Sequence, residues 1–164
     1  MDTTDTIAAI ATPLGSGGIG IIRVSGPQAI ALLDKLFRAE SGLSAAEMAS
    51  HRLYYGEVRA FGDGLLLDRG LAVCMRAPHS YTGEDVVELQ LHGGMRLLRL
   101  ALTAAVGAGA RLARPGEFTL RAFLNGRLDL AQAEAVQDVI AAQSRRAVGQ
   151  AAANLSGGLS ARVA

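Results

Sequence analysis

The segment RPGEFTLRAFLNGRLDLAQAEAVQDVI, residues 114–140, constrains the fold more strongly than any other part of this chain. Pro115 and Gly116 break the preceding element, and residues 117–125 then predict a short, mainly apolar helix. Gly126 can end that helix, because glycine adopts the left-handed conformation without a steric cost. Asp129 begins a capping-box spacing that predicts the start of a second helix.

This second helix is predicted to be long. Small residues at Ser144 and Ala147 fill in an apolar stripe that has a helical period and permits close helix packing. The stripe consists of Ala133, Val136, Ile140, Val148, Ala151 and Leu155. From Arg114 onward we therefore expect a wholly helical region. We expect it to be incomplete, because few later residues remain to cover the stripe.

The chain before Arg114 mixes short strands with helices. Strands are predicted at residues 7–11, 19–24, 53–60, 71–75 and 87–92, and helices at 27–37 and 96–106. In the last strand Val87, Leu89 and Leu91 alternate with polar residues, which gives one apolar and one polar face. This pattern favours an α+β fold, namely a compact mixed β-sheet domain with flanking helices followed by an incomplete all-α segment. We place the boundary near Pro115 to Thr119.

Charge and cysteine content exclude several classes of protein. Sixteen basic and fifteen acidic residues leave a net charge of +1, so no overall field draws the chain to nucleic acid or to an anionic membrane. Cys74 is the only cysteine, which excludes an internal disulfide and fits a reducing compartment. Asp2 and Asp5 stand where a secretory signal would be basic, and no long apolar run follows. We therefore expect no membrane segment and a cytoplasmic location.

Two features that could indicate a nucleotide site or a catalytic base, a glycine-rich loop and a histidine, are interpreted as structural. Gly15, Gly17 and Gly20 have the G-x-G-x-x-G spacing of dinucleotide sites, but the sequence GIGIIRV that follows predicts a strand and offers no helix N-terminus to a phosphate. We interpret this loop as a flexible turn. His92, at a strand end without an evident partner, is interpreted as structural. The histidines share no metal-ligand spacing, so no metal site is predicted.

Two charged residues interrupt apolar strands. Arg23 requires an anion, several carbonyls or an acidic residue on a neighbouring strand, because a buried unpaired charge is costly. Glu88 can accept two parallel hydrogen bonds from an amino-pyrimidinone edge, which a pterin ring presents, or can lie on a solvated strand face. Tyr81, Glu84 and Asp85 precede that strand and are expected to form a turn. Ligand binding and a structural ion pair both remain open.

Three segments in order resemble the N-terminal part of the MnmE (TrmE) family of tRNA-modification GTPases: DTIAAIATPLGSGGIGIIRVSG, PHSYTGEDVVELQLHGG and the segment from Arg114. The resemblance covers nearly the whole chain and lacks a distinctive segment only at about 38–70. It implies that residues 1–118 form a tetrahydrofolate-binding and dimerisation domain and that residues 119–164 begin a helical domain. It also implies that Arg23, Glu88 and Arg127 contact the folate, with Arg127 standing where many relatives have lysine. No catalytic residue is predicted.

The resemblance further implies what the full-length protein does. It would hydrolyse GTP and, with the flavin-dependent partner MnmG (GidA), form a 5-carboxymethylaminomethyl-type modification on the wobble uridine of tRNA. This part would bind 5-formyl-tetrahydrofolate or a related tetrahydrofolate as a homodimer. GTP, magnesium and potassium ions are expected only in a GTP-binding domain. Because no G-x-x-x-x-G-K-[ST] phosphate loop occurs in this sequence, we expect this chain alone to lack GTPase activity.

Two alternatives remain open. In the first, the chain is a non-enzymatic dimerisation module in which Arg23 and Glu88 form only a structural ion pair. In the second, it is a stand-alone folate-dependent one-carbon transferase, which the absence of an obvious acid/base pair disfavours.

Overall fold

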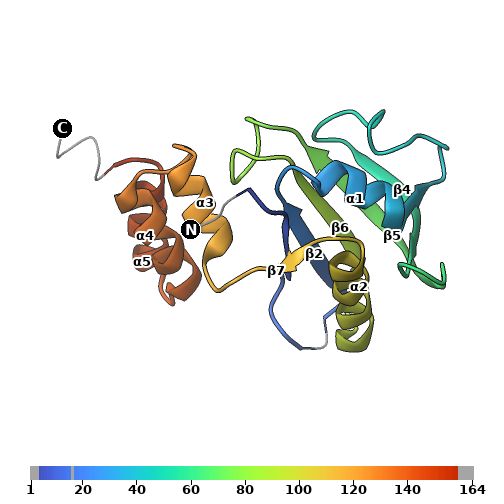
Figure 1. Ribbon diagram of the computed structural model, residues 1–164. Helices are drawn as coiled ribbons and strands as arrows, with labels where there is room; N and C mark the ends of the chain where they lie inside the picture. The colour runs from blue at the N-terminus through green and yellow to red at the C-terminus, as the bar shows by residue number, and fades with distance from the viewer. Residues whose placement is uncertain (1–3, 16, 159–164) are drawn as a thin grey trace. The chain divides into compact units, whose positions relative to one another are not determined.

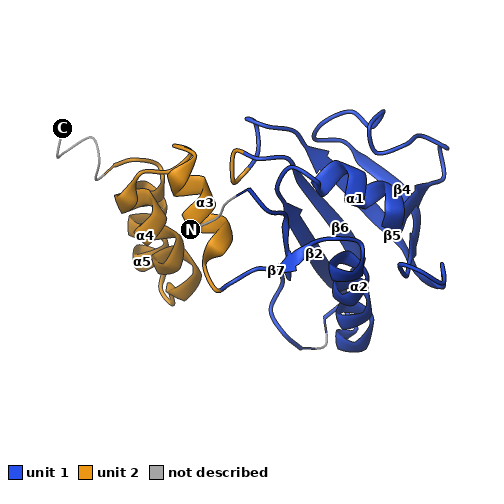
Figure 2. Cartoon of the chain, in the orientation of Figure 1, with its two compact units in different colours: residues 1–80, 84–114 blue, residues 81–83, 115–164 orange. Residues whose placement is uncertain are grey.

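The computed structural model describes residues 4–15 and 17–158, which divide into two compact units (Figure 2). The first unit comprises residues 1–80 and 84–114, and the second comprises residues 81–83 and 115–164. A seven-stranded sheet with helices on it forms the first unit, and the second is helical. This arrangement confirms the predicted α+β class. Within the described ranges, no helix combines the length and the apolar character needed to cross a membrane.

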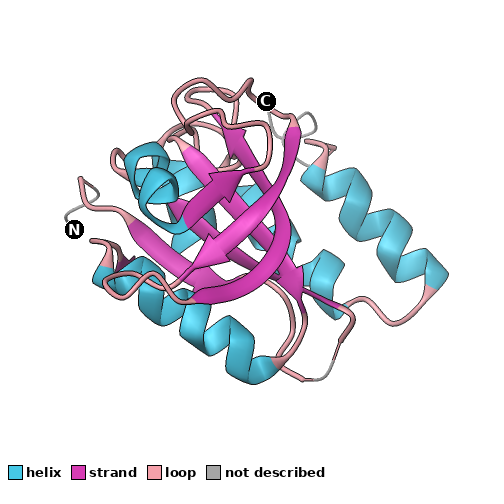
Figure 3. Ribbon diagram, turned by 90° about the vertical axis from the view of Figure 1, so that its right-hand side faces the viewer, coloured by secondary structure: helices cyan, strands magenta, loops and turns pink. Residues whose placement is uncertain are grey.

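The sheet has the strand order β3-β4-β5-β6-β2-β1-β7. Neighbouring strands are antiparallel except β1 and β7, which pair in parallel. The strands twist across the sheet (Figure 3). Their bounds are β1 Ile7–Ile10, β2 Ile19–Ser25, β3 Phe37–Ala39, β4 Leu53–Arg59, β5 Leu66–Met75, β6 Val86–His92 and β7 Arg111–Leu112.

Three strands differ from the sequence-based prediction. β5 begins at Leu66 instead of residue 71, because pairing with β4 extends the ladder through residues that are poor strand formers, such as Asp68 and Gly70. β3 and β7 were not predicted, since strands this short show no period. Long-range backbone hydrogen bonds define β7, and one of them runs from the Arg111 amide to the Thr6 carbonyl at 2.8 Å.

Helices α1 (Ala29–Leu36) and α2 (Met95–Gly107) supply the other half of the core of the first unit (Figure 1). Leu33 of α1 and Leu98 of α2 are each 1% exposed and belong to the same buried cluster as Ile22 of β2. Gly20 allows the close approach of α2, because a Cβ at this position would lie 2.5 Å from a methyl carbon of Leu98. One face of the sheet therefore packs against α1 and α2 and forms the core with them.

The second unit contains α3 (Glu117–Leu124), α4 (Leu130–Ala141) and α5 (Arg145–Leu155). Gly126 adopts φ +70° after α3, as predicted. The capping box is also confirmed: the Gln132 amide donates to the Asp129 side chain at 2.8 Å, and the Asp129 amide donates to the Gln132 side chain at 2.9 Å.

The single long helix predicted after Asp129 is wrong, because the chain turns between α4 and α5. Ala142 is extended at φ −64° and ψ 124°, and the Ser144 hydroxyl accepts from the Ala147 amide at 3.1 Å as the N-cap of α5. Residues interpreted as fillers of one stripe instead start a new helix. Packing of α4 against α5 buries Ala135 and Ala151, whereas Ile140 and Val148 of the predicted stripe stay 75% and 46% exposed.

Replacement of Gly56 tests the packing at the sheet edge. Gly56 pairs with Ala39, and an added Cβ would collide with the backbone carbonyl oxygen of Arg38, which cannot move away easily. We expect Gly56→Ala to lower the free energy of unfolding by about 1–3 kcal/mol, as overpacking does. Urea unfolding measures the change. Gly18→Ala is the control, because nothing lies within 4 Å of its added methyl group; equal midpoints for the two variants would contradict the packing.

Cys74 provides a second test, because it is the only thiol and is fully buried on β5. Burial raises the pKa of the Cys74 thiol to about 11, so at pH 8 only about one thiol in a thousand is ionised. We expect the native chain to react slowly with a disulfide reagent at pH 8 and to release one equivalent when urea unfolds it. Rapid stoichiometric labelling of the folded chain would show that this strand is not buried.

Candidate functional site

The face of the sheet opposite α1 and α2, here called the open face, carries the predicted site residues. Successive side chains of a strand point to opposite faces, so residues that alternate with the buried Ile22 and Leu89 share this face. By register the open face comprises Ile19, Ile21, Arg23, Leu53, Tyr55, Glu57, Arg69, Leu71, Val73, Glu88, Gln90 and His92. Half of these residues are apolar, and several of the apolar ones are exposed.

Arg23 and Glu88 lie directly opposite each other on β2 and β6. The Arg23 Nε donates to Glu88 Oε1 at 2.8 Å, with the Arg23 side chain 29% exposed and that of Glu88 13%. The expected alternative of an acidic partner on a neighbouring strand is thus confirmed. Glu88 Oε2 has no protein hydrogen-bond partner among the described residues, so it remains able to accept from a ligand.

Apolar residues flank this ion pair on both sides. Glu88 is opposite Val73 of β5, which is opposite Leu53 of β4, and Arg23 is opposite Ala9 of β1. The pair is therefore the only charge in a row across five strands of the described sheet. Hydrogen bonds in such surroundings are stronger than in water, because little solvent screens them.

The turn before β6 is held by its own acidic residues. The Ser25 hydroxyl donates to Glu84 Oε2 at 2.6 Å, and the Ser80 hydroxyl donates to the Glu84 carbonyl at 2.5 Å. Asp85 accepts from the Ala77 amide at 2.9 Å. The prediction that Glu84 and Asp85 form the turn is confirmed. This turn fixes the start of the strand that carries Glu88.

Arg127 belongs to the second unit, whereas Arg23 and Glu88 belong to the first. Its amide donates to the Ala122 carbonyl at 2.8 Å, so the residue is fixed by the end of α3. Its Cγ would lie 3.1 Å from a Cβ at Gly83, and the neighbouring Asn125 donates to the Thr82 carbonyl at 2.7 Å. The structure brings Arg23 and Glu88 together and places Arg127 beside the turn residues 82–83.

A hollow of about 510 Å³ lies on the open face one row away from the ion pair. Gln90 follows Glu88 by two residues on β6, which places it roughly 7 Å along the same face. The hollow is lined by Gly18, Ile19, Tyr55, Arg69, Gly70, Leu71, Gln90, Leu91 and His92. It combines an aromatic ring, aliphatic side chains and three polar groups.

His92, at the edge of this hollow, has a partner that sequence reasoning missed. Asp68 accepts from the His92 amide at 2.9 Å and lies 2.9 Å from the ring Nδ1. Burial by itself would raise the pKa of Asp68, but hydrogen bonds, above all those from His92, hold it below its usual value. The two residues are 24 positions apart and meet only where β5 and β6 pair, so no local signal reveals them.

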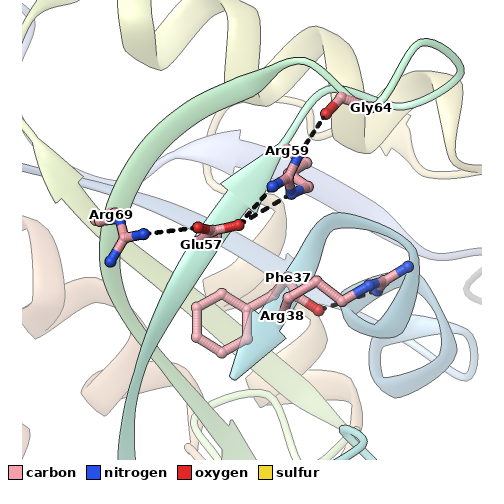
Figure 4. A network of polar contacts seen from close by, with 6 residues as sticks. All are labelled: Phe37, Arg38, Glu57, Arg59, Gly64 and Arg69. Atoms are coloured by element: carbon pink, nitrogen blue, oxygen red, sulfur yellow. Dashed lines mark hydrogen bonds and ion pairs between the residues drawn. The ribbon is translucent and has the colours of Figure 1, made fainter. Parts of the chain in front are cut away.

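The Glu57 side chain binds the guanidinium groups of Arg59 and Arg69 beside the hollow (Figure 4). Its carboxylate accepts from Arg59 Nη2 at 2.6 Å and from Arg69 Nη2 at 2.8 Å. These bonds, first among them those from Arg59, lower the pKa of Glu57 despite some desolvation. One carboxylate therefore faces two guanidinium groups, which leaves a positive excess at this edge.

The described residues contain no group of three or more His, Cys, Asp or Glu side chains suited to hold a metal ion. The site can instead offer hydrogen bonds and an apolar surface. Its polar groups are an oriented carboxylate, two guanidinium groups and an imidazole. Such a set of groups is chemically suited to a flat ligand with polar edges.

Comparison with known proteins gives a consistent match. Residues 6–127 match the family described as the N-terminus of the GTP-binding protein TrmE. A protein of Symbiobacterium thermophilum named tRNA modification GTPase MnmE is 56% identical over 155 residues, covering 94% of this chain and 34% of the relative. Proteins of the same name from Chloroflexus aurantiacus and Bacillus velezensis are 55% and 46% identical, each over 97% of this chain.

This chain spans about a third of the length of these relatives. The family match covers all seven strands of the sheet and extends through α3 to Arg127. The chain therefore belongs to the TrmE N-terminal family, which includes proteins named tRNA modification GTPase MnmE.

Proposed function

We propose that this chain is the folate-binding and dimerising part of a tRNA-modification GTPase. In this proposal residues 1–118 bind 5-formyl-tetrahydrofolate, or a related tetrahydrofolate, and residues 119–164 begin the helical domain. The observation that carries the proposal is the Arg23–Glu88 pair in the middle of an apolar row on the open face. A purely structural sheet face has no need for a charge pair there, because apolar residues of similar volume are often as stable.

The residues present fit a reduced pterin. The amino-pyrimidinone edge of the pterin has two parallel N–H donors, and Glu88 has a free acceptor at Oε2 in addition to the lone pairs of Oε1. Arg23 can donate to the ring carbonyl while it holds the carboxylate in place. Val73 and Ile21 provide apolar surface next to the pair. Binding and orientation are the tasks of these residues, since the folate itself carries the one-carbon unit.

Arg127 is the third proposed folate contact. Its guanidinium is a permanent cation with several donors, so it suits an anionic or carbonyl group of the ligand. The end of α3 and the turn at Gly83 hold its backbone and stem. An ammonium at this position would keep the charge and lose the planar set of donors.

Homodimerisation is the second proposed role of the open face. Ile19 is 68% exposed, Leu53 51% and Tyr55 46%, although all three lie on a sheet that is well packed on its other face. Exposed apolar residues gathered on one face mark an interaction surface. A second copy of the chain, covering Leu53 and the parts of Ile19 and Tyr55 that the ligand leaves exposed, accounts for their exposure in the single chain.

The remaining roles belong to the full-length protein. We propose that it hydrolyses GTP with magnesium and potassium ions in another domain and that it works in the cytoplasm. Together with the flavin-dependent partner MnmG and tRNA, it would form the 5-carboxymethylaminomethyl-type group on the wobble uridine. The relatives, about three times as long as this chain, carry GTPase in their names. This chain alone would not hydrolyse GTP, because its sequence has no phosphate loop.

Replacement of Glu88 tests folate binding directly. We expect 5-formyl-tetrahydrofolate to bind the wild-type chain saturably in calorimetric titration and Glu88→Gln to weaken it by at least about tenfold, since the charged acceptor is lost. Glu134→Gln, an exposed change on α4, should bind like the wild type. Absence of binding by a well-folded wild-type chain would refute the proposal and favour the dimerisation module.

A charge exchange separates the ligand role from a structural ion pair. Arg23→Glu combined with Glu88→Arg keeps an ion pair across β2 and β6 and reverses its polarity. We expect the double variant to be more stable than either single variant and still to bind no folate, because the acceptor and donors have exchanged places. Unfolding midpoints and titration together measure this. Folate binding by the double variant at the wild-type affinity would contradict the proposed contacts.

A further inference from the structure

We propose that the hollow on the open face binds the benzoyl-glutamate portion of the same ligand, with Arg69 and His92 as specificity-determining residues. This inference rests on the proposed folate function and extends it from the pterin to the tail. The ligand class is an aryl amide that carries carboxylates. Asp68 acts as a positioning residue, because it holds His92.

The position of the hollow matches a ligand laid along β6. Glu88, Gln90 and His92 share the open face, and Gln90 and His92 lie roughly 7 and 14 Å beyond Glu88 at the rise of an extended strand. A pterin bound at Glu88 with its long axis along β6 therefore has its substituent pointing either toward the hollow or in the opposite direction. In the direction of the hollow, the substituent would meet the polar groups of Arg69, Gln90 and His92.

The middle of the hollow suits a benzene ring. Leu71 lies opposite Gln90, and Tyr55 lies opposite Leu71, so an aliphatic and an aromatic side chain are adjacent in one row. Gly70 lets β5 lie close to β6 beside this row, because a Cβ at this position would collide with the Gln90 carbonyl oxygen. A flat ring gains apolar contact with Leu71 and an aromatic neighbour in Tyr55.

The far edge of the hollow suits a carboxylate. Arg59 and Arg69 share the single carboxylate of Glu57, so one positive charge is not balanced within this cluster. Arg69 uses one nitrogen for Glu57, and its side chain is 56% exposed. Its other N–H groups have no acceptor among the described residues and can donate to a ligand carboxylate.

His92 suits the amide between the ring and the glutamate. Asp68 is 12% exposed, and its ionised carboxylate only accepts hydrogen bonds, so the His92 ring donates to it from Nδ1, which fixes the tautomer whenever the ring carries a single proton. Nε2 is then an acceptor, and it has no partner among the described residues. The N–H of the ligand amide supplies the matching donor. Arg69 and His92 thus bind different groups of the same tail.

Titration with two ligands tests the inference. One ligand is 5-formyl-tetrahydrofolate, and the other is 5-formyl-6-methyl-tetrahydropterin, which lacks the tail. We expect the wild-type chain to prefer the complete ligand by at least tenfold. Arg69→Met should remove most of this preference and leave the affinity for the pterin unchanged, and Asp68→Asn should reduce it. Arg99→Met, an exposed change on α2, is the matched control.

The outcomes separate the inference from the proposed function. If neither ligand binds, the proposed function fails together with the inference. If both ligands bind with equal affinity, or if Arg69→Met weakens both equally, the folate function stands and the inference is overturned. Sedimentation of Arg69→Met should give the same oligomeric state as the wild type; loss of a wild-type dimer would show that the hollow is a subunit contact and would also overturn the inference.

Discussion

The pairing of β2 with β6 is the constraint on which the rest of the first unit depends. Seven consecutive residue pairs, from Ile19 with His92 to Ser25 with Val86, set its register. A slip of β2 by one residue against β6 would turn Arg23 toward α1 and α2, where its charge would lose its solvation, and would leave Glu88 without its partner. The buried partners of this register, such as Ile22 with Leu89, fill the core on the other face. The same ladder therefore builds the core and presents the site.

This arrangement lets one surface serve both proposed roles, ligand binding and dimerisation. The open face is apolar enough to attract a flat ligand or a second copy of the chain, and its few polar groups lie in defined rows. The charge pair, the hollow and the Asp68–His92 contact follow one another along β6. A ligand bound there would be recognised at both ends. Backbone pairing holds these groups on rigid strands, which favours binding with little rearrangement.

Sequence patterns between neighbouring residues predicted some helix ends and the faces of β6, whereas the contacts made by strand pairing could not be predicted from them. The capping box at Asp129 and the left-handed Gly126 were predictable, because each depends on residues close in sequence. The alternation in β6 likewise predicted its two faces. The partner of Arg23 is 65 residues away, so its need for an anion was evident and its identity was not. The break at Ser144 was missed, because the apolar period continues across it while a serine hydroxyl caps the next helix.

Amide chemical-shift mapping by NMR with 5-formyl-tetrahydrofolate tests the central claim most directly, because it locates the ligand without altering any residue. The account predicts saturable shifts on β2, β5 and β6, largest around Arg23 and Glu88, and little change along α1. The absence of saturable shifts, or shifts confined to α4 and α5, would contradict it.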